Sequence, residues 1–138
     1  MDFDKLVSTF DFLDDWEERY ALIIDLGRKL ADMDDSLKTD ESKVRGCQSQ
    51  VWMVHTVVDD AQHIEFLADS DAHIVRGLIA ILMMIYSGRT PTEILAVPIK
   101  DHFAKLGLDE HLSPLRSNGL HSMVERIRTT AAVVAAGS

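Results

Sequence analysis

The chain has very little cysteine: Cys47 is the only one among 138 residues. One cysteine cannot close an internal disulfide, so the sequence is not that of a secreted, disulfide-stapled protein. Cys-x-x-Cys pairs, His pairs at i, i+4 and glycine-rich phosphate loops are also missing. The motifs of zinc sites and nucleotide-binding loops are therefore not present.

Long apolar runs and an excess of basic residues are missing as well. The start, Met1 to Lys5, does not resemble a signal peptide, and the longest apolar stretch, Gly77 to Tyr86, is too short to span a bilayer. Lys and Arg number 14 against 23 Asp and Glu, which gives a net charge of −9. This charge argues against nucleic acids and anionic membrane surfaces as partners. We expect a cytoplasmic location.

The residues that are present predict one α+β domain over residues 1–138. A hydrophobic fraction of 46% in 138 residues is enough for a core without metal or disulfides. Apolar residues at helical spacing predict helices near both ends and an apolar, buried helix over 72–87. Asp14 with Glu17 is expected to cap the second helix, and Asp69, Ser70 and Asp71 the central one. Two short helical pieces should follow up to residue 107. Ser113-Pro114 should open a turn or a helix, and a last amphipathic helix is expected from Asn118.

The middle of the chain predicts a small antiparallel sheet. Residues 42–45 could form a short strand, 51–58 are rich in β-branched and aromatic residues, and 63–68 alternate after a turn. The 51–58 segment is largely apolar on both faces, which suggests a strand covered on both sides. We therefore expect about three strands packed against helices.

Cys47 lies in a segment that does not favour regular structure. A lone cysteine is usually a small buried hydrophobe. Cys47, however, stands between Gly46 and a polar triplet rather than in an apolar run. Gly46 permits an unusual backbone, and Lys43 and Arg45 are near enough in sequence to favour a thiolate. The local sequence thus favours a reactive thiol displayed on a loop.

The residues alone leave the chemistry of that thiol open. A cysteine hydrolase needs a histidine base, and none of the six histidines carries a recognisable local signature. A single cysteine cannot run a dithiol redox cycle. The remaining possibility is a thiol that accepts an acyl group, sulfane sulfur or an electrophile from another protein and passes it on.

Four segments resemble the SufE/CsdE family of sulfur acceptors, and they occur in the family's order. The most specific is the cysteine motif, Val44-Arg45-Gly46-Cys47-Gln48-Ser49-Gln50-Val51-Trp52. The others are Asp14-Asp15-Trp16-Glu17-Glu18-Arg19-Tyr20, Asp69-Ser70-Asp71-Ala72-His73-Ile74-Val75-Arg76-Gly77-Leu78 and His111-Leu112-Ser113-Pro114-Leu115-Arg116-Ser117-Asn118-Gly119-Leu120. The resemblance covers nearly the whole chain and departs from the family at Leu115, where members often have Ser.

The resemblance implies the fold shared with IscU-type scaffold proteins, as a single SufE-like domain. It implies that Cys47 receives sulfane sulfur as a persulfide from a pyridoxal-phosphate cysteine desulfurase of the SufS or CsdA type. Arg116 occupies the family's arginine position. The remaining loop or partner-binding candidates are Arg45, Gly46, Gln48, Ser49 and Gln50.

The implied function is activation of the desulfurase and relay of its sulfur to iron–sulfur cluster assembly. No stand-alone turnover is expected, and pyridoxal phosphate is expected only in the desulfurase. No metal site is expected, because the zinc motifs are missing. Cluster building on this chain is not expected either, because the scaffold function of IscU-type relatives needs three cysteines and this chain has one. The alternative is a non-catalytic adaptor that binds a desulfurase without carrying sulfur. Whether the free protein is a monomer or a dimer is left open.

Overall fold

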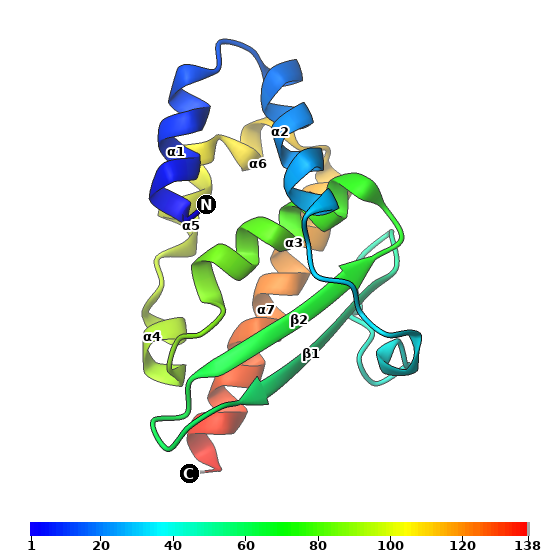
Figure 1. Ribbon diagram of the computed structural model, residues 1–138, viewed down its shortest axis with the longest axis vertical. Coiled ribbons are helices and arrows are strands. Elements are labelled where there is room, and N and C mark those ends of the chain that lie inside the picture. The colour runs from blue at the N-terminus through cyan, green and yellow to red at the C-terminus, as the bar shows by residue number, and fades with distance from the viewer. Residues whose placement is uncertain (138) are drawn as a thin grey trace.

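The computed structural model describes residues 1–137. Two helices, α3 and α7, run behind a β-hairpin, and the N-terminal helices close one end of the molecule (Figure 1). The elements, in chain order, are α1 (Phe3–Phe12), α2 (Trp16–Arg28), a 3₁₀ turn η1 (Asp35–Leu37), β1 (Val51–Val57), β2 (Ile64–Ser70), α3 (His73–Tyr86), α4 (Pro91–Ala96), α5 (Ile99–Leu106), α6 (Leu108–His111) and α7 (Pro114–Ala136). This arrangement confirms the α+β class.

Helix α3 is the centre of the core, as its apolar sequence predicts. Nine of its 14 residues are buried, among them Ile79, Ile81 and Leu82 with no exposed surface. It packs most extensively on α2, and a side chain at Gly77 would overlap the Ile23 carbonyl of that helix. The absence of a side chain at Gly77 therefore lets the two helices approach closely.

The sheet has two strands, so the expectation of about three was wrong. β1 and β2 pair antiparallel from Val51↔Ser70 to Val57↔Ile64. Residues 42–44 add only one bridge to β1, in which the Val44 N–H donates to the Val51 carbonyl and the Met53 N–H to the Ser42 carbonyl, both at 2.8 Å. The turn at residues 45–46 ends this pairing after three residues, which is too short for a strand.

β1 is also less covered than its apolar sequence suggests. Val51 and Met53 are buried, but His55, Thr56 and Val57 are exposed. This exposure concerns β1, because Ile64 and Phe66 of β2, which pair with Val57 and His55, are buried in the core. Within residues 1–137 no helix is both long and apolar enough to cross a membrane.

Several helix starts differ from the sequence predictions. Asp15, and not Asp14, caps α2, with its carboxylate accepting from the Glu18 N–H at 2.9 Å. Helix α7 begins at Pro114, four residues before the predicted Asn118, because Ser113 caps it and Pro114 fits its first position.

The expected acidic cap of α3 is absent, because these side chains have other partners. The N-cap is Ala72, whose side chain cannot cap the helix, and the Ser70 hydroxyl accepts from the Ala72 N–H at 3.2 Å instead of from an N–H within the helix. Asp69 lies in β2, only 5% exposed, where it pairs with Arg76 and lies 3.4 Å from the Lys38 ammonium. Arg76 also donates to carbonyls at the C-terminal end of α2, at 3.2 and 3.3 Å. The pair therefore ties β2, α3 and α2 together.

Candidate functional site

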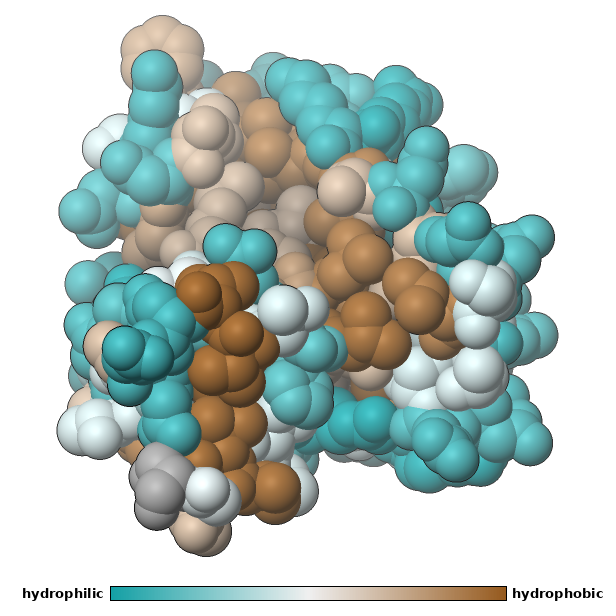
Figure 2. All heavy atoms as spheres, turned by 60° about the horizontal axis from the view of Figure 1, so that its bottom comes forward, coloured by the Kyte–Doolittle hydropathy of each residue, from teal (hydrophilic) through white to brown (hydrophobic). Residues whose placement is uncertain are grey.

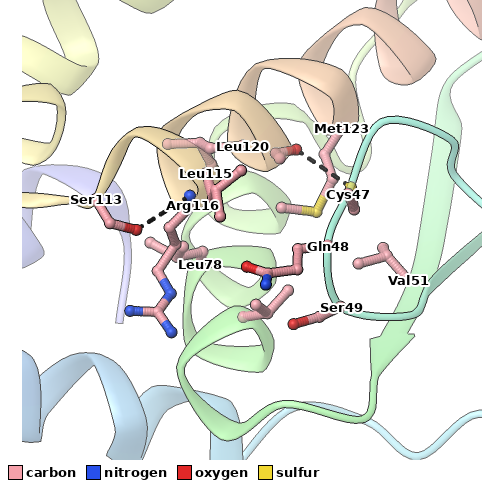
Figure 3. A pocket seen from close by; sticks show the side chains of 12 residues that line it. Cys47, Gln48, Ser49, Val51, Leu78, Ser113, Leu115, Arg116, Leu120 and Met123 are labelled. Carbon is pink, nitrogen blue, oxygen red and sulfur yellow. Dashed lines mark hydrogen bonds between the residues drawn. The ribbon is translucent and has the colours of Figure 1, made fainter.

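The Cys47 loop follows the short bridge at residues 42–44 and leads into β1. Gly46 has a φ of 88°, in the left-handed region, and turns the chain so that Cys47 points back toward α7. A Cβ at Gly46 would lie 2.5 Å from the Ser122 Oγ of α7. The loop therefore rests directly on that helix (Figure 3).

Cys47 opens into a small pocket between the loop, α3 and the N-terminal half of α7. The lining residues are Cys47, Gln48, Ser49, Val51, Val75, Leu78, Ser113, Leu115, Arg116, Gly119, Leu120 and Met123. The pocket volume is about 50 Å³. A water-sized group needs roughly 10–15 Å³ of such space, so the pocket has room for one further sulfur atom on Cys47.

The Cys47 thiol is half-buried and faces a backbone acceptor. Its Sγ donates to the Gly119 carbonyl across 3.5 Å. Burial raises the pKa of the Cys47 thiol. Arg45 is exposed, and among residues 1–137 no cation contacts the sulfur. The expectation that Lys43 and Arg45 favour a thiolate is wrong for this resting state, since desolvation disfavours the charged form.

The other candidate site residues divide into two groups. Gln48, Ser49 and Arg116 line the pocket, with Arg116 reaching in from the first turn of α7 (Figure 3). Gln50 is instead tied to the loop before α3: its N–H donates to the Asp71 carboxylate at 3.1 Å, and its carbonyl accepts from the Asp71 N–H at 3.3 Å. The structure thus brings Arg116 to the cysteine loop across 69 positions of sequence, while Arg45 points to solvent.

The apolar pocket walls were not found from the sequence. Val75 and Leu78 come from α3, and Leu120 and Met123 from α7. Trp52 and Met53, the apolar residues that follow Val51 in β1, do not line the pocket. Gly119, in the second turn of α7, gave no sequence signal for the pocket either, because a Cβ there would lie 3.6 Å from the Cys47 sulfur, an ordinary contact distance.

The geometry does not support a cysteine hydrolase. No histidine lines the pocket or bonds the Cys47 sulfur in the described part of the chain. His121, on α7, instead bonds the Asp109 carboxylate at 3.2 Å. The same residues, 1–137, contain no cluster of three or more His, Cys, Asp or Glu side chains suited to a metal ion.

Known proteins resemble this chain over nearly its whole length. The profile of the SufE family, described as an Fe-S metabolism associated domain, matches residues 4–131. An uncharacterized SufE-like protein of Rhizobium etli is 52% identical over 135 residues, covering 96% of this chain and 91% of the relative. Another, from Rhizobium meliloti, is 48% identical over 130 residues, covering 93% of each chain.

A solved structure has the same fold. It is the solution structure of a hypothetical protein from Thermus thermophilus, with a TM-score of 0.76 and coverage of 97% of this chain and 96% of its own. At 19% identity this likeness concerns the fold alone. The profile match and the two close relatives show that the chain belongs to the SufE family, which supports a general role in sulfur transfer with cysteine desulfurases.

Proposed function

We propose that this protein accepts sulfane sulfur on Cys47 from the persulfide of a cysteine desulfurase and relays it to iron–sulfur cluster assembly in the cytoplasm. The observation that supports this proposal most directly is the placement of the chain's single thiol. Cys47 lies on a surface loop, and its sulfur faces a pocket with room for one more atom of its size.

The transfer step is a thiol–disulfide exchange with sulfur as its cargo. The Cys47 thiolate attacks the outer sulfur of the desulfurase persulfide and forms a new S–S bond. The S–S bond to the desulfurase breaks, and that enzyme's cysteine leaves as a thiolate. Cys47 then carries the persulfide, and the numbers of atoms, electrons and protons balance without another oxidant or reductant.

The buried thiol has a direct consequence for this step. Because burial raises the pKa of Cys47, the resting protein holds it as a thiol, which is a weak nucleophile. We propose that the loop leaves the pocket when the desulfurase binds, since the attack needs a thiolate that reaches the partner's cysteine. After transfer, the apolar walls at Leu78, Leu120 and Met123 would shield the persulfide from solvent oxidants.

The neighbouring residues receive separate proposed roles. Gly46 allows the turn, and Gln48 and Ser49 shape the wall beside the sulfur. Gln50, through Asp71, fixes the end of the loop from which Cys47 would move. Arg45 and Arg116 are placed to meet the desulfurase, Arg45 from the exposed loop and Arg116 from the pocket rim.

The proposed partner is a pyridoxal-phosphate desulfurase of the SufS or CsdA type. In this proposal the desulfurase supplies the cofactor chemistry that releases sulfur from cysteine, and this chain contributes only the accepting thiol. The downstream partner would be an iron–sulfur scaffold. The protein would raise desulfurase turnover and have no turnover of its own.

Intact-mass spectrometry tests the proposal. The protein is mixed with a desulfurase, pyridoxal phosphate and L-cysteine without reductant, and a gain of one sulfur, about 32 Da, is expected and should be reversed by thiol. Cys47→Ser should show no gain and no stimulation, with an unchanged fold. Stimulation by Cys47→Ser equal to that of the wild type would instead establish the non-catalytic adaptor.

A further inference from the structure

One stripe of α7 lies against the cysteine loop and the residues that precede it. Gly119, Ser122 and Arg126 are spaced at i, i+3 and i+7, so they project from the same side of the helix. The Gly119 carbonyl accepts from the Cys47 thiol, and the Ser122 hydroxyl lies where a Cβ of Gly46 would meet it. The arginine, one turn further along the helix, contacts the chain just before the loop.

Arg126 binds the stem of the loop, residues 41–44, through two backbone carbonyls. Its Nη2 donates to the Glu41 carbonyl at 2.8 Å, and its Nη1 donates to the Lys43 carbonyl at 3.3 Å. The stem's bridge to β1 uses two other backbone groups, each at 2.8 Å. Because the backbone groups of neighbouring residues in such a bridge point to opposite sides, β1 and Arg126 hold the stem from opposite sides.

The contacts that α7 makes with the thiol and with the stem differ in strength. A thiol is a weak donor, and the Cys47 Sγ lies 3.5 Å from the Gly119 oxygen. The Arg126 guanidinium is charged and makes two bonds to the stem, and charge-assisted hydrogen bonds are roughly twice as strong as neutral ones. When the loop leaves α7, the thiol should therefore separate first, while the stem stays bound to Arg126.

We propose that Arg126 is a positioning residue for sulfur transfer, because it holds the stem on α7 while the loop opens and so fixes the point from which Cys47 reaches the desulfurase. This inference rests on the proposed function of Cys47 as the sulfur acceptor. Cys47 lies four residues after Lys43, and four residues span at most about 14 Å when fully extended. The anchor therefore restricts the thiol to a short arc around a fixed stem.

The part of α7 that follows Arg126 has other contacts. Arg128, the next arginine, donates to the Leu95 carbonyl of α4 at 3.2 Å. Residues 131–136 are alanine and valine only, and Val133 is 66% exposed. Figure 2, which brings the C-terminal end of the molecule forward, shows apolar surface bordered by hydrophilic side chains. No later side chain of α7, up to residue 137, donates to the stem, so Arg126 is its last anchor on this helix.

Two rates measured on Arg126→Met test the proposal. Alkylation of Cys47 by a small reagent needs only an exposed thiol, whereas transfer from the desulfurase also needs a thiol in the right place. We expect Arg126→Met to be alkylated several-fold faster than the wild type and to gain persulfide, followed by intact mass, at least ~10-fold more slowly. Arg126→Lys, which retains a charged donor, should recover part of the transfer rate. Arg128→Met removes the same kind of side chain from the same helix and should change neither rate.

The opposite signs of the two changes separate positioning from a merely structural role. Transfer to Arg126→Met as fast as to the wild type overturns the proposal, and so does an equal loss in Arg128→Met. If Arg126→Met does not fold, Arg126→Lys decides, with smaller changes of the same signs. A wild type that gains no persulfide from an active desulfurase overturns the proposed function, and with it any role of Arg126 in transfer. The anchor itself is tested separately by amide exchange: the Val44 and Met53 amides, which bond across the bridge to β1, should exchange faster in Arg126→Met, and unchanged exchange refutes the anchor.

Discussion

Gly46→Ala should release the Cys47 loop from its pocket. Gly46 adopts a φ of 88°, which costs an L-residue roughly 1–2 kcal/mol. The added Cβ would also lie 2.5 Å from the Ser122 Oγ. Accommodating an extra methyl in a filled space typically costs about 1–3 kcal/mol. Both penalties apply only while the loop is seated, because a released loop can rotate away from α7.

Together these terms amount to roughly 2–5 kcal/mol against the seated loop. Since about 1.4 kcal/mol corresponds to a factor of ten, the released population should increase by about 30-fold to 4,000-fold. The release exposes Cys47 to water and removes the burial that raises its pKa. The thiol should then react faster with a small alkylating reagent, and its pKa should fall toward the ordinary value.

The assay is the rate of Cys47 alkylation as a function of pH. Gly88→Ala is the matched control, because Gly88 has a similar φ of 81° but open space around its Cβ position, and it lies away from the loop. In the double variant Gly46→Ala with Ser122→Gly, the contact with the Ser122 side chain is absent and only the backbone strain at residue 46 remains. Part of the loop population should therefore return to the pocket. An unchanged rate and pKa in Gly46→Ala, in a folded protein, would refute the reasoning.

Three further predictions follow from the same geometry. First, the pH profile of Cys47 alkylation should have a higher midpoint in the native protein than in urea, because burial raises the pKa of the native thiol. The stability that the buried thiol contributes is fully present below the pKa of the unfolded thiol, and it is lost as the pH rises through the pKa of the native thiol. Equal midpoints in the native and the urea-unfolded protein would contradict this. Second, Asp69→Ala should lower the free energy of unfolding by about 3–5 kcal/mol in urea titrations, because it leaves the mostly buried Arg76 with only the exposed Asp32 carboxylate, 3.9 Å away, as a counter-ion. A loss below about 1 kcal/mol would show that the pair of Asp69 and Arg76 contributes little. Third, Arg45→Ala should leave the alkylation pKa of the free protein unchanged, because Arg45 is exposed; a rise in that pKa would restore the electrostatic role that its place in the sequence suggests.

Local patterns in the sequence were sufficient for most of the elements. The apolar residues of α3 recur on all its faces, and only a helix enclosed by the rest of the molecule can bury such a surface. The Thr90-Pro91 start of α4 was also predictable, because its capping box is made within four residues. Residues 46–50 form an irregular loop, as their composition indicated.

Apart from the starts of α2 and α7, the errors concern contacts between distant parts of the chain. Asp69 is a plausible helix cap by sequence, but Arg76 and Lys38 together offer it a buried charge-paired site in β2. The segment 42–45 has the composition of a strand, but whether it pairs depends on how far β1 stays alongside it. Neither outcome could be predicted from neighbouring residues.

The sequence by itself determined which residue is the candidate for the proposed chemistry, because Cys47 is the only cysteine and its surrounding motif is distinctive. Only the tertiary structure decided the state in which the thiol rests. Its burial depends on Gly119 and Leu120 of α7 and on Leu78 of α3, which lie 31 to 73 positions away in sequence. The pKa of a thiol is set by the solvent and charges around it, and those come from whatever the fold packs against the loop.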